Sequence, residues 1–224
     1  MAQIEVLEEK EKKAKLEIEE FGNSITNKFK NLVLDEYDLG NISSFKNGLN
    51  FSRGSKGELI EIVGVKDFQN KFSPDINSLE KIQIDGRLSV EYNLKPSDIL
   101  VVRSNGSSNL VGRFLFINEL NTKTSFSGFT IRIRPVSGKV DAKYLCYYLK
   151  TDIVRAKLAG SSKGSNIKSL NQTLLSSVKI PLPPLADQQT IVAEIETIEA
   201  QIAVLETEIN KIPAEKEAIL KKYL

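Results

Sequence analysis

Few side chains are available for catalysis, because the 224 residues include no histidine and one cysteine. The lack of histidine excludes Ser-His-Asp and Cys-His nucleophiles and every His-ligated metal site. The single cysteine, Cys146, excludes an internal disulfide and a multi-thiolate zinc site. Cys146 lies in an apolar run, so we expect it to be a buried structural thiol.

Carboxylates and glycine-rich loops supply no catalytic set either. The sequence contains no Gly-x-Gly-x-x-Gly, no Walker lysine loop and no Asn-Pro-Pro-aromatic stretch with which to methylate a base. A nuclease cluster could begin at Pro74-Asp75, but the next Asp-x-Lys starts far away at Asp141, which is better explained as a helix cap. We therefore expect a non-catalytic chain with no cofactor and no metal site.

Side chains suited to binding gather in three loops rich in glycine, polar and basic residues. One follows an apolar strand and begins at Arg103, and the others are Lys46–Gly57 and Gly160–Lys168. Arginine can bind guanine O6 and N7, asparagine can bind adenine N6 and N7, and serine reaches phosphates or base edges. Each loop alone could be an ordinary surface turn, but three in one domain favour DNA recognition. The candidate DNA-binding residues are Arg53, Lys56, Arg103, Ser104, Asn105, Ser107, Lys163, Ser165, Asn166 and Lys168.

The formal net charge of +2 conceals a strongly basic block. Residues 100–180 include 13 basic and 3 acidic side chains, a net charge of +10, whereas residues 1–30 and 187–224 have net charges of −1 and −4. Such a block favours a polyanionic partner, most simply nucleic acid. The alternative is a basic surface that contacts only solvent.

The elements that must position these loops include a long helix at the C-terminus. Its apolar residues alternate at intervals of four and three, which is the heptad seam of a coiled coil. A proline-rich stretch ending at Pro184 forbids helix before it, and Asp187 can cap it. We expect Pro213 to end or kink this helix before a short helix over Ala214–Leu224. The seam that would contact a second copy or a partner consists of Ile191, Ile195, Ile198, Ile202, Leu205, Ile209 and Ile212.

Residues 1–30 follow the same apolar rhythm and predict a second helix. A two-helix hairpin within one chain would leave much of both seams exposed, so we expect a helical bundle across a homodimer, with antiparallel helices. The alternative is that each helix lies on its own domain.

Residues 31–183 predict a globular domain between the N-terminal helix, residues 1–30, and the C-terminal helix, residues 184–224. Short apolar runs separated by Gly, Asn and Ser turns predict an α+β fold with a twisted or barrel-like sheet. A helix is expected over Asp141–Leu158. The predicted strands are Leu59–Val65, Lys81–Ile84, Ile99–Arg103, Arg113–Ile117 and Thr130–Pro135.

No apolar run approaches the roughly 20 residues needed to cross a bilayer. The start of the chain is charged and shows no signal peptide. We therefore expect a cytoplasmic protein, and the low cysteine content suits a reducing compartment.

The stretch that leads into the C-terminal helix resembles a known family. Specificity subunits of type I restriction–modification systems have a proline-rich turn between a target recognition domain and a long helix, similar to Ile180–Val192 here. Ser97–Ser104 resembles the family's Gly-Asp-Ile-Leu strand, with Ser97 where glycine is usual. Tyr37–Ile42 resembles the domain start, and Tyr144–Leu149 and Gly160–Leu170 resemble the helix and polar loop at its end.

The resemblance covers residues 30–224 and implies half a specificity subunit, since family members usually contain two recognition domains. It implies a homodimer that binds double-stranded DNA at a bipartite palindromic site and docks DNA methyltransferase subunits, with or without restriction subunits. S-adenosylmethionine and ATP would belong to those partners. Two alternatives stay open: a recognition fragment of a fused restriction–methylation enzyme, and an anti-restriction or regulatory protein that occupies the methyltransferase docking site.

Overall fold

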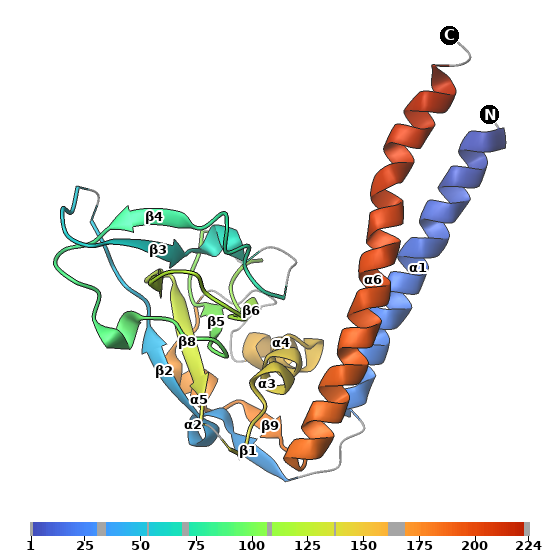
Figure 1. Ribbon diagram of the computed structural model, residues 1–224. Coiled ribbons are helices and arrows are strands. Elements are labelled where there is room, and N and C mark those ends of the chain that lie inside the picture. The colour runs from blue at the N-terminus through green and yellow to red at the C-terminus, as the bar shows by residue number, and fades with distance from the viewer. Residues whose placement is uncertain are drawn as a thin grey trace. The chain divides into compact units, whose positions relative to one another are not determined.

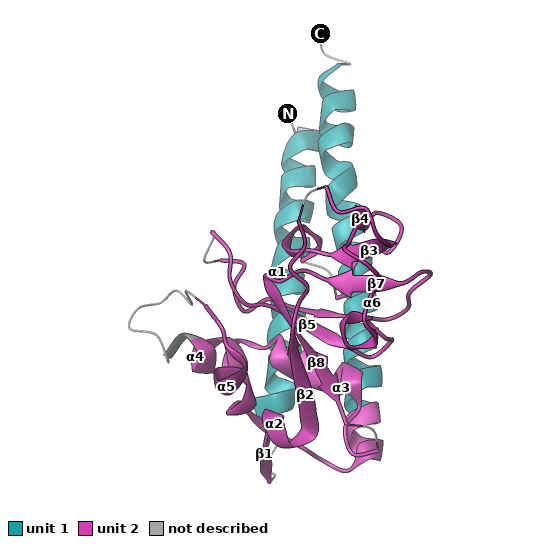
Figure 2. Ribbon diagram, turned by 90° about the vertical axis from the view of Figure 1, so that its left-hand side faces the viewer, with its two compact units in different colours: residues 1–32, 190–224 teal, residues 33–189 magenta. Residues whose placement is uncertain are grey.

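The computed structural model describes residues 2–30, 35–52, 54–68, 72–106, 109–136, 138–160 and 169–221. The chain divides into two compact units (Figure 2). Unit 1 comprises residues 1–32 and 190–224, and unit 2 comprises residues 33–189. No helix in the described ranges is long and apolar enough to cross a bilayer.

Helices and short strands are combined in the chain, as predicted (Figure 1). The strands are β1 Glu36–Asp38, β2 Ser43–Asn47, β3 Leu59–Val63, β4 Glu80–Gln83, β5 Ile99–Val102, β6 Phe114–Phe116, β7 Thr124–Phe126, β8 Thr130–Pro135 and β9 Lys179–Pro181. The helices are α1 Ala2–Lys30, α2 Leu39–Ile42, α3 Ala142–Leu149, α4 Asp152–Gly160, α5 Gln172–Ser176 and α6 Leu185–Leu220, with 3-10 turns at Val65–Asp67 and Val90–Tyr92.

An antiparallel sheet with the order β2-β8-β5-β6 lies at the centre of unit 2. All four residues of β5 are buried, which is why this strand is a continuous apolar run rather than an alternating one. One core cluster joins Leu100 and Val102 of β5 to Val63 of β3 and Phe126 of β7. The core therefore packs the central sheet against a second sheet, ordered β4-β3-β7.

The predicted barrel-like sheet is wrong. In the part of the chain that the structure describes, the strands form three open sheets: the central sheet, the β4-β3-β7 sheet and the β1-β9 pair. A barrel closes only when its two edge strands pair. The edges of the central sheet, β2 and β6, pair instead with β8 and β5. Because β3, β4 and β7 belong to a separate sheet, the four remaining strands are too few to enclose a core.

All five predicted strands are present, as β3, β4, β5, β6 and β8, with ends within two residues of the predictions. The prediction missed β1, β2, β7 and β9. These strands have three to five residues and lack a run of alternating apolar side chains. Their pairing with distant partners, rather than their local sequence, makes them strands.

The helix predicted over Asp141–Leu158 is two helices, α3 and α4. The Asp141 side chain caps α3 as predicted and accepts a hydrogen bond from the Tyr144 amide at 2.9 Å. The two helices separate at Thr151, because its hydroxyl and its amide both donate to the Tyr148 carbonyl and close a tighter turn. Cys146 is completely buried in α3, as predicted.

Unit 1 is a hairpin in which α1 and α6 run antiparallel, side by side (Figures 1 and 2). Ion pairs fix their register. Lys28, near the end of α1, pairs with Glu194, and Lys10 pairs with Glu208 at 3.2 Å. The two terminal helices of one chain therefore pair with each other.

The helix α6 continues through Pro213 to Leu220. Of the predicted end or kink at Pro213, the end is therefore wrong, and so is the separate short helix after it. Proline removes one backbone donor from the ladder. Beyond it, Lys216 lies 3.5 Å from carboxylate oxygens of both Glu8 and Glu11 on α1, which holds the last turns in place. The 36 residues of α6 extend about 54 Å at ~1.5 Å per residue.

Candidate nucleic-acid interface

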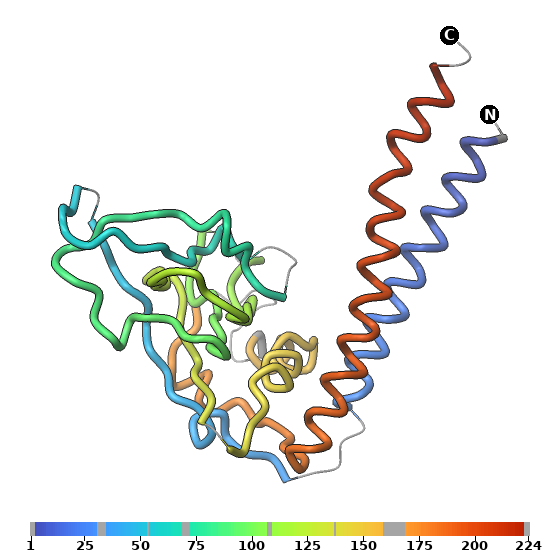
Figure 3. Tube along the Cα trace, viewed as in Figure 1, coloured from blue at the N-terminus to red at the C-terminus, as the bar shows by residue number. Residues whose placement is uncertain are grey.

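Parts of two predicted DNA-binding loops, and the residues that follow the third, lie at one end of the central sheet (Figure 3). The third loop itself, Gly160–Lys168, lies outside the described residues from residue 161 on. The strand β2 ends at Asn47, next to Ile131 of β8, and β5 ends at Val102, opposite Thr130 of β8. Because both strands are antiparallel to β8, their ends lie beside the start of β8. We call this part of unit 2, residues 46–50, 103–106, 127–130 and 169–172, the loop end.

Backbone hydrogen bonds join the segments of the loop end around Arg103. The amide of Leu170 donates to the Arg103 carbonyl at 2.7 Å, and the Arg103 amide donates to the Phe129 carbonyl at 2.9 Å. The Gly48 amide donates to the Thr130 carbonyl at 3.0 Å. The four segments of the loop end are thus fixed next to one another.

Four of the ten predicted DNA-binding residues lie in the described ranges. Lys56 is exposed, and Arg103, Ser104 and Asn105 are partly exposed. Within those ranges, Nε of Arg103 is buried and makes no hydrogen bond, although its backbone is tightly held. The other six, Arg53, Ser107, Lys163, Ser165, Asn166 and Lys168, lie outside the described residues.

Two glycines of the 46–57 segment serve the fold itself. A Cβ atom on Gly48 would lie 2.0 Å from the Ser127 carbonyl oxygen, and one on Gly57 would lie 2.3 Å from the Ile84 carbonyl oxygen. Both glycines are therefore required for close backbone packing. Around Gly106 a Cβ would meet no atom within 4 Å, so this glycine leaves room for another molecule to approach.

Lys46 and Asn47 are held by the protein. The Nζ of Lys46 forms a 2.7 Å ion pair with Glu91 and lies 4.7 Å from the centroid of the Tyr92 ring. The hydrogen bond to Glu91 raises the pKa of Lys46. Asn47 Oδ1 accepts a hydrogen bond from Gln172 Nε2 at 3.1 Å, which connects α5 to the end of β2.

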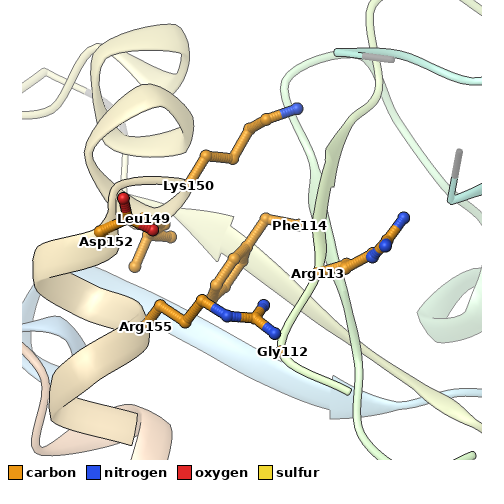
Figure 4. Close-up of a pocket in the computed structure, with 7 residues that line it drawn as sticks. All are labelled: Gly112, Arg113, Phe114, Leu149, Lys150, Asp152 and Arg155. Atoms are coloured by element: carbon orange, nitrogen blue, oxygen red, sulfur yellow. The ribbon is translucent and has the colours of Figure 1, made fainter. Parts of the chain in front are cut away.

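A basic cavity, missed by the sequence analysis, opens beside the loop end (Figure 4). Its volume is about 430 Å³, and its lining consists of Gly112, Arg113, Phe114, Leu149, Lys150, Asp152 and Arg155. Because β6 is antiparallel to β5, its first residue, Phe114, lies opposite Val101 at the same end of the sheet. Arg155 is exposed and extends toward Gly112, while the Arg113 side chain points away and donates to the Asn109 carbonyl at 3.1 Å.

The proline-rich junction is organised by Gln188, which is completely buried. Its Oε1 accepts a hydrogen bond from the Asp141 amide at 2.8 Å, and its Nε2 donates to the carbonyls of Lys139 and Pro183 at 3.0 and 2.8 Å. Gln188 therefore fixes the first turn of α6 to the connection between β8 and α3.

Two tyrosines of α3 hold the strand β9. The Tyr144 hydroxyl donates to the Pro181 carbonyl at 2.7 Å, and the Tyr148 hydroxyl donates to the Lys179 carbonyl at 3.1 Å. Burial raises the pKa of both phenols, to about 12 for Tyr148. Both hydroxyl groups therefore stay protonated at neutral pH and serve the fold.

Residues 17–214 match the family model described as the type I restriction modification DNA specificity domain. Over 151 residues, the chain is 33% identical to the type I restriction enzyme StySPI specificity subunit of Salmonella potsdam. This match covers 67% of this chain and 32% of the StySPI subunit. The chain is also 28% identical over 130 residues to the type I restriction enzyme EcoKI specificity subunit of Escherichia coli K12, a match that covers 58% of this chain and 27% of the EcoKI subunit. The matches thus span about a third of these relatives or less.

Two solved structures have a similar fold. The HsdS subunit from Thermoanaerobacter tengcongensis has a TM-score of 0.64 at 20% identity, covering 99% of this chain and 55% of that one. The type I restriction–modification S subunit from M. genitalium has a TM-score of 0.56 at 15% identity, covering 99% and 58%. Since the family model matches most of the sequence, the chain belongs to the family of type I restriction–modification specificity subunits, as its junction and strand motifs indicated.

Proposed function

We propose that the chain recognises a DNA sequence through the loop end and takes no catalytic part in the complex it serves. The observation that supports this most directly is that backbone hydrogen bonds bring parts of two predicted binding loops, and the residues that follow the third, together around Arg103. Cations such as Lys56 and Arg155 can hold phosphates, while arginine, serine and asparagine side chains can read base edges. A rigid sheet that supports variable loops is a common basis for selective binding.

We also propose that two copies act together as a homodimer. The matched region spans 32% of the StySPI subunit and 55% of the Thermoanaerobacter chain. Within the hairpin of unit 1, five residues of the α6 seam remain partly exposed: Ile191, Ile198, Ile202, Leu205 and Ile209. Further apolar side chains, Val6, Leu16, Val204 and Leu220, are exposed. A second hairpin would cover such surfaces and complete a four-helix bundle.

A two-fold symmetric dimer would present two identical recognition domains to a bipartite palindromic site. DNA methyltransferase subunits would dock on this scaffold and methylate the selected sequence, and restriction subunits would cleave unmodified DNA. S-adenosylmethionine and ATP would bind to those partners.

The two alternatives differ in how well they fit the charge distribution. An acidic domain surface would favour an anti-restriction or regulatory protein that occupies the methyltransferase docking site. The net charge of +10 over residues 100–180 argues against this alternative. A recognition fragment of a fused enzyme would use the same loop end, and the partial coverage of the relatives fits it equally.

Methylome sequencing tests the proposed function. The full chain would be co-expressed with a type I methyltransferase subunit in a host that lacks other methylation. We expect methylation at one bipartite sequence with inverted, identical halves. A host in which both proteins form a complex without any sequence-specific methylation would contradict the proposal, and an asymmetric sequence would contradict the homodimer.

A further inference from the structure

The turn between β7 and β8 presents a large exposed aromatic side chain at the loop end. Phe129 is 59% exposed, whereas Phe126, three residues earlier, is completely buried in the core. The fold thus uses one phenylalanine of this short stretch for packing and leaves the other in solvent.

Hydrogen bonds within the turn fix the backbone that carries Phe129. The amide and the hydroxyl of Thr130 donate to the Ser127 carbonyl at 2.8 and 2.7 Å, and the Phe129 amide donates to the Ser127 hydroxyl at 3.3 Å. Because this backbone is already ordered, a partner that contacts the ring has little conformational entropy to remove.

The turn is also held from both sides by candidate DNA-binding segments. On one side, the Gly128 amide donates to the Leu49 carbonyl at 2.8 Å, and a Cβ on Gly128 would lie 2.0 Å from Asn50 Oδ1. On the other side, the Phe129 carbonyl accepts the Arg103 amide. Phe129 therefore lies between the 46–57 segment and the segment that begins at Arg103.

Single exposed apolar residues are common on protein surfaces, so the surroundings of Phe129 decide its interpretation. The segment whose Arg103 amide donates to the Phe129 carbonyl continues to the partly exposed Asn105, and the Asn50 side chain lies against Gly128. Further along the 46–57 segment are a second exposed ring, Phe51, which is 41% exposed, and the exposed cation Lys56. Duplex DNA offers matching chemistry, because it combines phosphates and polar base edges with two apolar features, the thymine methyl group and the faces of the bases.

We propose that Phe129 is a specificity-determining residue whose ring packs against a base of the target DNA. The apolar contact is made either on the methyl group of a thymine or in an opened base step. This inference rests on the proposed function, because it requires the loop end to face DNA.

The test compares Phe129→Ala with Val136→Ala in the full chain. Val136 is 56% exposed and follows β8 at the opposite end of the strand, so it is a matched apolar control. The probes are a duplex selected from a random-sequence pool by the wild-type protein and an unrelated duplex. We expect F129A to bind the selected duplex about tenfold more weakly or worse. Binding of the unrelated duplex, and the slope of log affinity against log salt, should not change, because the substitution removes no cation that binds a phosphate.

Two further experiments distinguish contact with a thymine methyl group from insertion into an opened base step. Replacing each thymine of the selected duplex with uracil in turn removes the methyl group, and at a contacted position it should weaken wild-type binding but not that of F129A. A 2-aminopurine label should brighten on wild-type binding if the ring opens a base step, and F129A should abolish that increase.

Equal affinities of F129A and V136A for the selected duplex, at equal melting temperatures, would overturn the proposal. So would an equal loss of affinity for both duplexes. If F129A fails to fold, Phe129→Leu is judged by the same criteria. A wild-type protein that binds no duplex in a salt-dependent manner would instead overturn the proposed function.

Discussion

Ser97 adopts a backbone conformation that glycine would adopt more easily. Its φ is +74°, in the left-handed region, and the family motif that it resembles has glycine at this position. The turn is fixed nonetheless, because the Asp98 carboxylate accepts the Lys95 amide at 2.7 Å and pairs with Arg134 at 2.6 Å. The strain at Ser97 is therefore held by the surrounding contacts.

We predict that Ser97→Gly stabilises the protein. A left-handed conformation costs a residue with a Cβ about 1–2 kcal/mol, and glycine at this position would remove that cost. The greater conformational freedom of glycine in the unfolded chain offsets part of the gain in stability. A net gain of about 1 kcal/mol should raise the melting temperature by about 2–4 °C. Ser89→Gly is the control, because Ser89 has a φ of −67° and should lose stability. A melting temperature of S97G below that of the wild type would contradict the inference that the Ser97 backbone is strained.

The basic cavity makes a second prediction at this scale. We expect Lys150→Ala with Arg155→Ala to weaken binding to every DNA sequence alike, since these cations would hold phosphates. The slope of log affinity against log salt should fall by about 0.9 for each phosphate that is no longer bound. Lys95→Ala is the control, because Lys95 is exposed and lies at the other end of β5. An unchanged salt slope would exclude this cavity from the DNA interface.

The candidate site was partly predictable from residue types. Arginine, asparagine and serine beside glycine identified the segment that begins at Arg103, but no local pattern shows that Leu170 returns to its carbonyl. The cavity at Arg155 was missed because Gly112, Arg113 and Phe114, which form one side of its lining, are distant in sequence from Arg155. The role of Gln188 was also hidden, since its three hydrogen bonds go to backbone groups.

At the scale of elements, α3 and β9 are joined by tyrosine hydroxyl groups that must stay protonated. The pKa of Tyr148 is raised by burial to about 12, above its ordinary value of about 10. Its contribution to stability is therefore fully present below pH ~10 and is lost as the pH rises toward ~12. Alkaline conditions should therefore weaken the contact between α3 and β9.

We predict that Tyr148→Phe lowers stability near neutral pH by about 1 kcal/mol, because the Lys179 carbonyl loses its donor. Between pH ~9 and ~11 the variant should lose less stability than the wild type, since it has no phenol to ionise at this site. Urea unfolding across this range measures both effects. Tyr37→Phe, at an exposed position, should follow the wild type, and parallel curves for Y148F and wild type would contradict the prediction.

Elements with strong local signals were predictable, and elements made by distant pairing were not. The apolar run of β5 identified a buried strand, and Asp141 identified the start of α3. The three residues of β7 become a strand because β3 pairs with them in parallel. The barrel prediction failed for the same reason, since sheet order depends on which distant strands meet.

At the scale of the whole molecule, the partly exposed seam predicts self-association. We expect Ile202→Glu to convert a dimer into monomers, because a carboxylate would have to be buried in the bundle. Sedimentation equilibrium measures the mass, and circular dichroism checks that the helices persist. Ala203→Glu is the control, since Ala203 is exposed and lies outside the seam. A monomeric wild type, or an unchanged dimer of I202E, would exclude this interface.

The pairing of β1 with β9 has a consequence for the history of such proteins. Residues 36–38 and 179–181 are antiparallel partners, so the chain enters and leaves unit 2 through adjacent, hydrogen-bonded strands. Any domain bounded by an equivalent pair of strands fits between the same two helices. Recombination at two points in the gene would therefore exchange the whole of unit 2 while the two helices stay the same. Under the proposed function, such an exchange would replace the DNA specificity in one step.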